Sequence, residues 1–358
     1  MFLEMDLSSK FPRFKLVLCL GMIFLSSCSD DNNAYKPSQN VSNAEFFLSL
    51  KDENGDFRIA KDSEFIILIP DTQYYIHNAS NNKYLEQIIT WILQFNNAGF
   101  KTRAVLQLGD ITESNSDVEF QRVKRIFSPL DSYIDYIFCT GNHDYGTNGT
   151  ANNRNTLFSN YLTYEQNKSL VSTYKSGEFE NSFFQINLFD KPLRIYSLEF
   201  GPSNDVLNWV LNLEKNNHGD NALLLTHTYL APNRERYNYS KYKLSQGPSP
   251  YAYGLSSLVK VNDGEEIWQK IIVNNPNFKF IFSGHNLSPG NDFHLISRND
   301  IGNNVLQMVY NKQDSPNGGD GWIKILEFTK DKKLFAKSYS PFLNKWEYND
   351  LSNNPFSF

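Results

Sequence analysis

Five short runs of residues that are apolar on both faces constrain the fold of this chain more than any other feature. A strand covered on both sides has this near-continuous apolar pattern, and such strands are typical of parallel sheets flanked by helices. Runs this short fit strands better than helices. The five runs are Phe65–Ile69, Ala104–Leu108, Ile134–Cys139, Ala222–Leu225 and Phe278–Phe282. We therefore predict central strands of a covered sheet at these positions.

Helical patterns separate several of these runs. Apolar residues recur at helical spacing within residues 84–93 and within residues 120–127. Ser203 is expected to cap a further helix that carries Val206 and Val210 on its apolar face. Alternation of strand and helix implies right-handed parallel crossovers, and hence an α/β fold.

The C-terminal third has a different pattern. Residues 305–310, 322–328 and 334–339 resemble strands, and turn-forming residues lie at 317–321 and 331–333. Strands joined by short turns are typical of antiparallel sheet, which we predict here. The polar, Asn-rich residues 146–177 are expected to run over the surface.

The N-terminal residues are expected to be a targeting signal. Lys10, Arg13 and Lys15 precede the apolar run 16–25, which is too short to span a bilayer and fits the apolar region of a secretory signal. The run ends in the sequence LSSC, whose last residue is Cys28. This resembles the lipobox of bacterial lipoproteins, in which the signal is cut before a cysteine that is then lipidated. An ordinary signal peptide that contains Cys28 by chance is the alternative.

Four segments follow from these patterns. Lipid attached at Cys28 would anchor the protein to a membrane at the cell envelope. The acidic pair Asp30-Asp31 resembles the surface-export signal of some Gram-negative lipoproteins, so we expect the outer membrane and leave open whether the protein faces the periplasm or the surface. The segments are a signal peptide (1–27), a flexible tether (28–62), a folded domain (63–345) and a C-terminal tail (346–358).

The charge balance limits the classes of partner. With 34 Lys+Arg and 39 Asp+Glu the formal net charge is −5, which provides no long-range attraction for nucleic acid. A bound metal can reverse the sign of the local field, so a small phosphorylated substrate remains compatible. Three cysteines cannot form a disulfide framework, and Cys139 is expected to be a small core residue. We expect a monomer.

Each of the five apolar runs is followed by a side chain that can bind a metal. In open α/β folds, sites form beyond the carboxyl ends of the strands. Carboxylates, amides and imidazoles gathered at one rim suit a centre that holds two metal ions. The candidates, in the order of the runs, are Asp71 and Gln73, then Asp110, then Asn142 with His143 and Asp144, then His227, and last His285.

The order of these motifs resembles the calcineurin-like metallophosphoesterases. The motifs are Asp-x-Gln, Gly-Asp, Gly-Asn-His-Asp, His and Gly-His, and they are most similar to a bacterial branch with Gln73 where most members have histidine. The resemblance extends from about Phe65 over nearly the whole remaining chain. It implies a four-layer αββα sandwich, with two mixed sheets flanked by helices. It also implies hydrolysis of a phosphomonoester or phosphodiester.

The resemblance implies a ligand set for two divalent metal ions. Asp110 would bridge both ions. Asp71 and Gln73 would hold the first ion, and the second would be held by Asn142, His227 and His285. Two cations bridged by one carboxylate share a water that is acidified toward neutral pH, and the resulting hydroxide would attack the phosphorus.

The resemblance also implies the proton donor. His143 would lie outside the metal ligands and protonate the leaving oxygen, oriented by Asp144. Glu113 is expected to orient its loop rather than to bind metal. Arg298 could hold the substrate phosphate through two hydrogen bonds, or form an ordinary surface salt bridge. Six tyrosines between residues 229 and 253 could line a substrate cleft or pack on their own loop.

One position departs from the family. Most members end with Gly-His-x-His, whose last histidine binds the first metal, but Leu287 stands there in this chain. The first metal is left with oxygen ligands only, which favours Mn²⁺ or Mg²⁺ over Zn²⁺. The second site, with two imidazoles, suits Mn²⁺, Zn²⁺ or Fe²⁺. His77 and His294 are candidates for the missing ligand.

Two other functions remain compatible with the sequence. Loss of a metal ligand at Leu287 favours a catalytically reduced, surface-anchored protein that only binds phosphate esters. Retention of Asn142, His143 and Asp144 argues against it, because a binding protein has little need of a proton donor for a leaving group. A two-metal nuclease is the third possibility, which the acidic charge balance does not favour.

Overall fold

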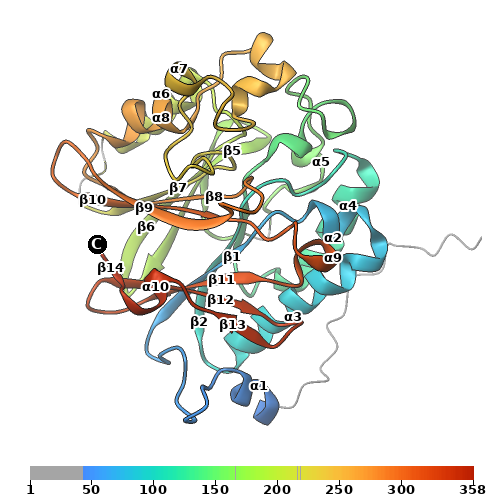
Figure 1. The fold of residues 1–358 in the computed structure, drawn as a ribbon, viewed down its shortest axis with the longest axis vertical. Helices are drawn as coiled ribbons and strands as arrows, with labels where there is room; N and C mark the ends of the chain where they lie inside the picture. The colour runs from blue at the N-terminus through green and yellow to red at the C-terminus, as the bar shows by residue number, and fades with distance from the viewer. Residues whose placement is uncertain (1–42, 166, 216, 218) are drawn as a thin grey trace, which may run out of the picture. The chain divides into compact units, whose positions relative to one another are not determined.

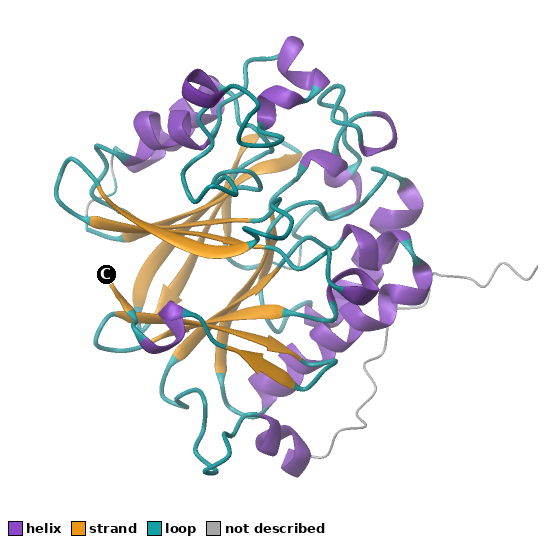
Figure 2. Cartoon of the chain, in the orientation of Figure 1, coloured by secondary structure: helices purple, strands orange, loops and turns teal. Residues whose placement is uncertain are grey.

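Two mixed β-sheets form the centre of the fold, and helices cover their outer faces (Figure 1, Figure 2). The computed structural model describes residues 43–165, 167–215, 217 and 219–358. Residues 1–42, which include Cys28, lie outside this range. The arrangement confirms the predicted αββα sandwich.

The first sheet has seven strands and combines parallel and antiparallel pairs. β1 pairs in parallel with β2, and β2 pairs in parallel with β3, whereas β1 and β11 are antiparallel. β14 (Phe356–Ser357) pairs with β12 at one side. In spatial order the other strands are β13 (Lys345–Glu347), β12 (Lys333–Ser340), β11 (Ile323–Phe328), β1 (Glu64–Ile69), β2 (Lys101–Gln107) and β3 (Tyr136–Phe138).

The second sheet also has seven strands. Its parallel pairs are β6 with β7, β7 with β8 and β8 with β10. In spatial order the strands are β4 (Leu170–Lys175), β5 (Glu178–Leu188), β6 (Lys191–Ser197), β7 (Asn221–Leu225), β8 (Phe278–Ser283), β10 (Asn304–Tyr310) and β9 (Asp292–Arg298).

The longer helices are α3, α4 and α6, and they connect parallel strands as predicted. Ser203 caps α6 by accepting a hydrogen bond from the Val206 amide (3.3 Å). Within the described residues, no helix is long and apolar enough to cross a membrane. The α-helices are α1 (Asn43–Ser49), α2 (Gln73–His77), α3 (Asn82–Asn97), α4 (Asp117–Phe127), α5 (Phe158–Tyr161), α6 (Asn204–Glu214), α7 (Tyr239–Tyr242), α8 (Gly264–Ile267), α9 (Pro316–Gly319) and α10 (Asp350–Asn353).

Short helical turns complete the secondary structure. η7 (Trp268–Ile272) is a π-helical turn that continues α8. The 3₁₀ turns are η1 (Ala79–Asn81), η2 (Ser128–Leu130), η3 (Asn142–Asp144), η4 (Thr147–Gly149), η5 (Pro250–Ala252) and η6 (Gly254–Ser257).

Strand β7 explains why the five runs are apolar on both faces. Ala222 and Leu224 pack in the cluster formed with α6 and η7, outside the second sheet. Leu223 and Leu225 belong to the other large cluster, which includes side chains of the first sheet. Successive side chains of a strand point to opposite faces, so a strand between two hydrophobic layers must be apolar at every position.

The structure differs from the predicted segments at both ends. The expected tether contains α1, and three of its residues, Phe46, Leu50 and Ile59, are buried in the core. The expected tail forms β13, α10 and β14, all packed against or paired with β12. In both segments the apolar runs are short and lie among polar residues, although several of their side chains are buried in the core.

The predicted C-terminal antiparallel sheet is correct only for β11 and β12. β10 lies in the second sheet, parallel to β8 and antiparallel to β9. The Asn-rich segment 146–177 contains β4, which pairs with β5. The core position of Cys139 is confirmed, because it is buried and forms no disulfide among the described residues.

Packing of the C-terminal segment can be tested with two matched substitutions. Leu351 is 2% exposed and Leu343 is 43% exposed. Leu351→Ala should lower the free energy of unfolding by about 2–5 kcal/mol, because it leaves a cavity in the core. Leu343→Ala should cost about 1 kcal/mol or less. Equal losses in urea denaturation would contradict an integral role for this segment.

Candidate metal centre

The six predicted metal ligands lie beyond the carboxyl ends of parallel strands in the two sheets. Asp110 follows β2 of the first sheet and His227 follows β7 of the second, and Asp110 Oδ2 lies 3.1 Å from His227 Nε2. His285, after β8, places Nδ1 3.2 Å from His227 Nε2. Asp71, Gln73 and Asn142 follow β1 and β3 on the side of the first sheet. All six side chains are buried: Asp71, Gln73, Asp110, Asn142, His227 and His285.

The free ring nitrogens of both histidines point into the site: His227 Nε2 faces Asp110, and His285 Nδ1 faces His227. His227 Nδ1 donates to the Leu108 carbonyl (2.7 Å), and His285 Nε2 donates to the Pro248 carbonyl (2.8 Å). Because a carbonyl only accepts hydrogen bonds, these bonds fix the tautomer of each neutral ring and leave His227 Nε2 and His285 Nδ1 as acceptors. Second ring nitrogens bound in this way are typical of metal-ligating histidines.

Three acceptor atoms therefore face one another: Asp110 Oδ2, His227 Nε2 and His285 Nδ1. These ligand atoms all lie within 4.8 Å of one another. Such a set is mutually repulsive unless a cation lies among the atoms. The donor set, one carboxylate and two imidazoles, suits a transition metal.

The pKa values of the two histidines shift in opposite directions. Burial alone would lower the pKa of His227, but the carboxylates of Asp110 and Asp71 outweigh it and raise the value to about 9. For His285, burial and the neighbouring His227 lower the pKa to about 4. Burial is the largest cause of the raised pKa of Asp71. Without metal the cluster thus holds a proton on His227, at the position where a metal ion would bind.

Two glycines of the motifs allow the carboxylates to approach the backbone. A Cβ atom on Gly141 would lie 2.1 Å from Asp110 Oδ1, and one on Gly284 would lie 2.3 Å from Asp71 Oδ1. Both distances are far below a normal contact, so a larger residue would displace the carboxylate. This explains why glycine precedes both Asn142 and His285.

The turn that carries Asp110 is held in an unusual conformation. Asp110 has φ 47°, in the left-handed region that non-glycine residues rarely adopt. Gln107 stabilises the turn because its amide both donates to the Gly109 carbonyl (2.8 Å) and accepts from the Gly109 amide (2.9 Å). The His143 amide donates to Asp110 Oδ1 (2.9 Å). Strain of this kind is found where function fixes the position of a side chain.

Two side-chain amide oxygens in the site have no hydrogen-bond partner within the described part of the chain. Gln73 Oε1 and Asn142 Oδ1 are buried, and neither has a hydrogen-bond partner among the described residues. An unpaired buried amide oxygen costs about 1–3 kcal/mol, and a bound ion, ligand or water would remove this cost. Their positions fit the predicted metal ligands.

His143 lines the pocket beside these residues, but Asp144 does not contact its ring. His143 Nδ1 donates to the Glu113 carbonyl (3.0 Å) and lies 3.5 Å from Glu113 Oε2. Asp144 instead accepts bonds from the backbone amides of Ile111, Thr112 and Gly141. Asp144 therefore fixes the loops at residues 111–112 and 141, and Glu113 orients the histidine.

The sequence pattern of the family described as calcineurin-like phosphoesterase matches residues 66–289, more than half of the chain. The chain belongs to the calcineurin-like phosphoesterase family. The matched region includes all six candidate ligands together with His143.

Individual relatives are distant. The uncharacterized protein YvnB of Bacillus subtilis (strain 168) is 24% identical over 297 residues, which are 81% of this chain and 21% of YvnB. The chain thus spans about a fifth of the length of this curated relative. Purple acid phosphatase PPD1 from yellow lupin (Lupinus luteus) has a TM-score of 0.46 at 13% identity, covering 80% of this chain and 52% of its own. A 5'-nucleotidase from Candida albicans has a TM-score of 0.41 at 11% identity, covering 79% and 52%.

Three other predicted residues lie away from the candidate metal centre. Arg298 lies at the opposite end of the second sheet, because it pairs with Asn304 at the start of β10, whereas the site lies beyond the other end of that strand. Its side chain donates to the Gly302 carbonyl (3.1 Å). His77 contacts Glu119 (3.0 Å) and His294 lies 3.7 Å from Asp350, and neither lines the pocket. These three predictions are not supported.

The tyrosine-rich loop combines both of its predicted roles. Tyr237 and Tyr253 line the pocket, and so does Tyr74 of α2. Tyr239 and Tyr251 instead stack on each other within the loop, with ring centroids 4.4 Å apart. Part of the loop therefore forms the wall of the site and part packs on itself.

Sequence reasoning missed two residues that support the ligands, Gln107 and Asn311. Asn311 Nδ2 donates to Asp71 Oδ2 (2.8 Å). Asn311 directly follows β10, so it carries the same signal as the recognised ligands, a polar residue after an apolar run. It was missed because β10 was assigned to the other sheet.

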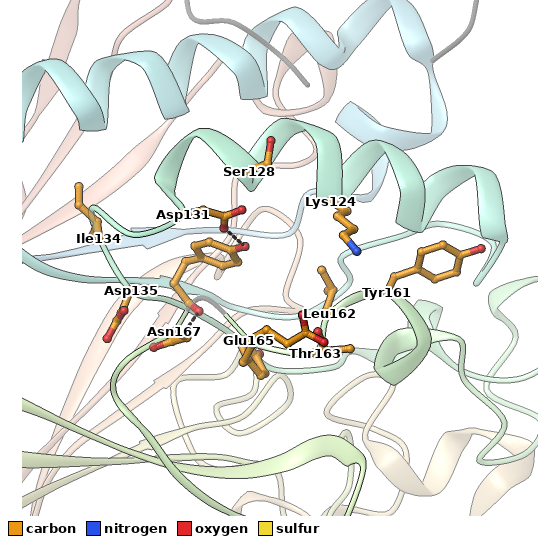
Figure 3. A pocket seen from close by; sticks show the side chains of 12 residues that line it. Lys124, Ser128, Asp131, Ile134, Asp135, Tyr161, Leu162, Thr163, Glu165 and Asn167 are labelled. Carbon is orange, nitrogen blue, oxygen red and sulfur yellow. Dashed lines mark hydrogen bonds between the residues drawn. The ribbon is translucent and has the colours of Figure 1, made fainter. Parts of the chain in front are cut away.

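A separate cavity of about 210 Å³ lies beside α4 and β3 (Figure 3). Asp131 and Asn167 line it, and both bond to Tyr136, at 2.7 Å and 2.9 Å. None of the predicted site residues lines this cavity. It is therefore distinct from the metal centre.

Close approach at Gly141 can be tested by adding one methyl group. Gly141→Ala should displace the Asp110 carboxylate and weaken Mn²⁺ binding by at least about tenfold. Gly177→Ala is the control, because its Cβ would meet nothing within 4 Å although its φ of 79° makes alanine unfavourable by about 1–2 kcal/mol. Isothermal titration calorimetry should show normal Mn²⁺ affinity in this control. Equal affinity in both variants would contradict the assigned contact.

Proposed function

We propose that this chain hydrolyses phosphoric esters, either monoesters or diesters, with two divalent metal ions at the site described above. The observation that carries the proposal is the set of three ligand atoms on Asp110, His227 and His285, which all lie within 4.8 Å of one another and could hold a metal ion. Bound divalent cations would act as Lewis acids toward the phosphate and lower the pKa of a bound water.

The pocket over these residues supports dependence on metal. Its volume is about 380 Å³, and its walls include Tyr74, Tyr253 and Leu287. No lysine or arginine is among the described residues that line it. A phosphate group would therefore have no side-chain cation to neutralise it there, apart from a protonated histidine. Metal ions are the remaining source of the positive charge that phosphoryl transfer requires.

We propose the ligand assignments as follows. Asp110 would bridge the two ions, because it follows β2 of the first sheet and its carboxylate contacts His227 of the second. Asp71 and Gln73 hold the first ion, for which their oxygen atoms favour Mn²⁺ or Mg²⁺. The imidazoles of His227 and His285, with Asn142, hold the second ion, for which Mn²⁺, Zn²⁺ and Fe²⁺ are suitable.

His143 is proposed as the general acid. Its Nδ1 is committed to the Glu113 carbonyl, so Nε2 is the atom that can donate a proton to the leaving oxygen. Asp110 fixes the backbone of His143 through the amide bond of 2.9 Å. The proton donor and the metal ligands are thereby held in one rigid unit, which favours a fixed geometry during reaction.

We further propose that the protein is attached to the cell envelope by lipid at Cys28, most simply at the outer membrane. The LSSC sequence supports this proposal. A lipid anchor would place the hydrolase where external phosphate esters reach it. It also needs no membrane-spanning helix.

Hydrolysis can be tested on the metal-stripped full chain refilled with Mn²⁺, using aryl phosphate monoesters and diesters. His143→Asn should lower kcat by about 10²–10⁴-fold and leave Mn²⁺ affinity unchanged, because the residue moves a proton and binds no metal. Asn142→Ala should lower both kcat and the affinity for Mn²⁺. His294→Asn, at a histidine outside the pocket, is the matched control and should keep full activity.

Absence of turnover would contradict the proposal. If neither ester is hydrolysed with Mn²⁺, Mg²⁺, Zn²⁺ or Fe²⁺ while the metal still binds, the chain is better described as a surface protein that binds phosphate esters. The ester that is hydrolysed faster assigns the substrate class.

Lipid attachment can be tested in a Gram-negative host by detergent phase partitioning. The wild-type chain should enter the detergent phase, and Cys28→Ser should remain uncleaved and unlipidated. Cys139→Ser is the control, because Cys139 is buried in the core. Partitioning that is the same for wild type and Cys28→Ser would refute the anchor.

A further inference from the structure

We propose that Gln313 supplies an oxygen ligand to the first metal ion, in place of the histidine that Leu287 replaces. The inference rests on the two-metal centre proposed above. It adds a ligand from the loop after β10, a part of the chain that contributes none of the six predicted ligands.

Gln313 shares its environment with two of those ligands. Its side chain is 6% exposed, and Oε1 is buried without a hydrogen-bond partner among the described residues. Gln73 Oε1 and Asn142 Oδ1 are in the same condition. All three side chains line one pocket with Asp110. Because a buried amide oxygen without a partner is destabilising, its presence beside two proposed ligand oxygens indicates the same role.

Hydrogen bonds link the backbone of Gln313 to Asp71, a proposed ligand of the first metal, through Asn311. The Gln313 amide donates to Asn311 Oδ1 (2.9 Å), and Asn311 Nδ2 donates to Asp71 Oδ2 (2.8 Å). The second metal's histidines are held instead by the carbonyls of Leu108 and Pro248. Gln313 is therefore positioned relative to Asp71 by a single bridging residue.

The loop that carries Gln313 is docked on the helix that carries Gln73. The Gly321 amide donates to the Tyr75 hydroxyl (2.9 Å). Gly318 lies so close to Tyr74 that a Cβ atom would be 2.8 Å from the tyrosine Cβ. These contacts hold the loop against α2 on the far side of Gln313 from Asn311. The loop that carries Gln313 is thus held at both ends, at Asn311 and at α2. A metal site requires ligands that are held in place in this way.

Leu287 lines the same pocket but offers no donor atom, and its side chain is 49% exposed. A ligand from Gln313 would complete a set of four oxygen donors: Asp71, Gln73, Asp110 and Gln313. An amide adds no charge, so the site keeps its preference for hard ions such as Mn²⁺ and Mg²⁺. The loop after β10 would thus provide the ligand that most family members have in the loop after β8.

The test is Mn²⁺ titration of the metal-stripped full chain, with electron paramagnetic resonance of free Mn²⁺ to count bound ions. The wild type should bind two ions. Gln313→Leu should weaken one of the two sites by at least about tenfold and leave the other unchanged. Gln313→Glu, which keeps an oxygen donor, should retain both. Leu287→Ala alters the same pocket wall without removing a donor and should also retain both.

Unchanged Mn²⁺ affinity at both sites in Gln313→Leu would overturn the proposal. If both Gln313 variants bind Mn²⁺ normally but Gln313→Glu raises KM, the residue contacts substrate and not metal. If circular dichroism shows that Gln313→Leu does not fold, Gln313→Asn serves instead. Its side chain is one methylene shorter, so the oxygen lies farther from the metal and the same site should be weakened.

The readout separates this inference from the proposed hydrolysis. A chain that binds two ions, loses one with Gln313→Leu and hydrolyses neither ester would refute the function and support the ligand. A wild-type chain that binds no Mn²⁺ would overturn both.

Discussion

The carboxylate of Asp110 lies against the ring of His227, and this contact joins the carboxyl ends of the two sheets. Several neighbouring residues hold Asp110 and His227 in this contact. Gln107 holds the turn that carries Asp110, Gly141 leaves space for its carboxylate, and the Leu108 carbonyl fixes the tautomer of His227. Each feature fixes the position of the carboxylate or of the ring beside it, so the folded chain holds a cluster of buried ligand atoms that a metal ion would stabilise.

Much of this arrangement could be predicted from the sequence because its signals are local. The five apolar runs became β1, β2, β3, β7 and β8, and the polar residue after each run reached the site. Asn311 also follows an apolar run, but its contact with Asp71 could not be predicted in the same way. Asn311 and Asp71 are 240 residues apart, and nothing in the sequence near either one indicates the other. The placement of β10 beside β8 depends on pairing across the sheet, which periodicity does not report.

Two differences from the family pattern involve neighbouring parts of the site. Leu287 removes a histidine from one loop, while Asp144 gives up the contact with His143 that the resemblance implied and binds backbone amides instead. Glu113 takes over the orientation of His143. The site keeps the elements that proton transfer needs, a held imidazole beside a cluster that attracts cations. Retention of these elements favours a hydrolase over a protein that only binds its ligand.

The central claim is that two cations lie between the sheets with Asp110 in common. Anomalous diffraction from crystals grown with Mn²⁺ tests it most directly, because it locates the ions independently of any activity. The account predicts two peaks that share Asp110, one bound by His227 and His285 and the other by Asp71 and Gln73. A single peak, or peaks that do not contact Asp110, would contradict it.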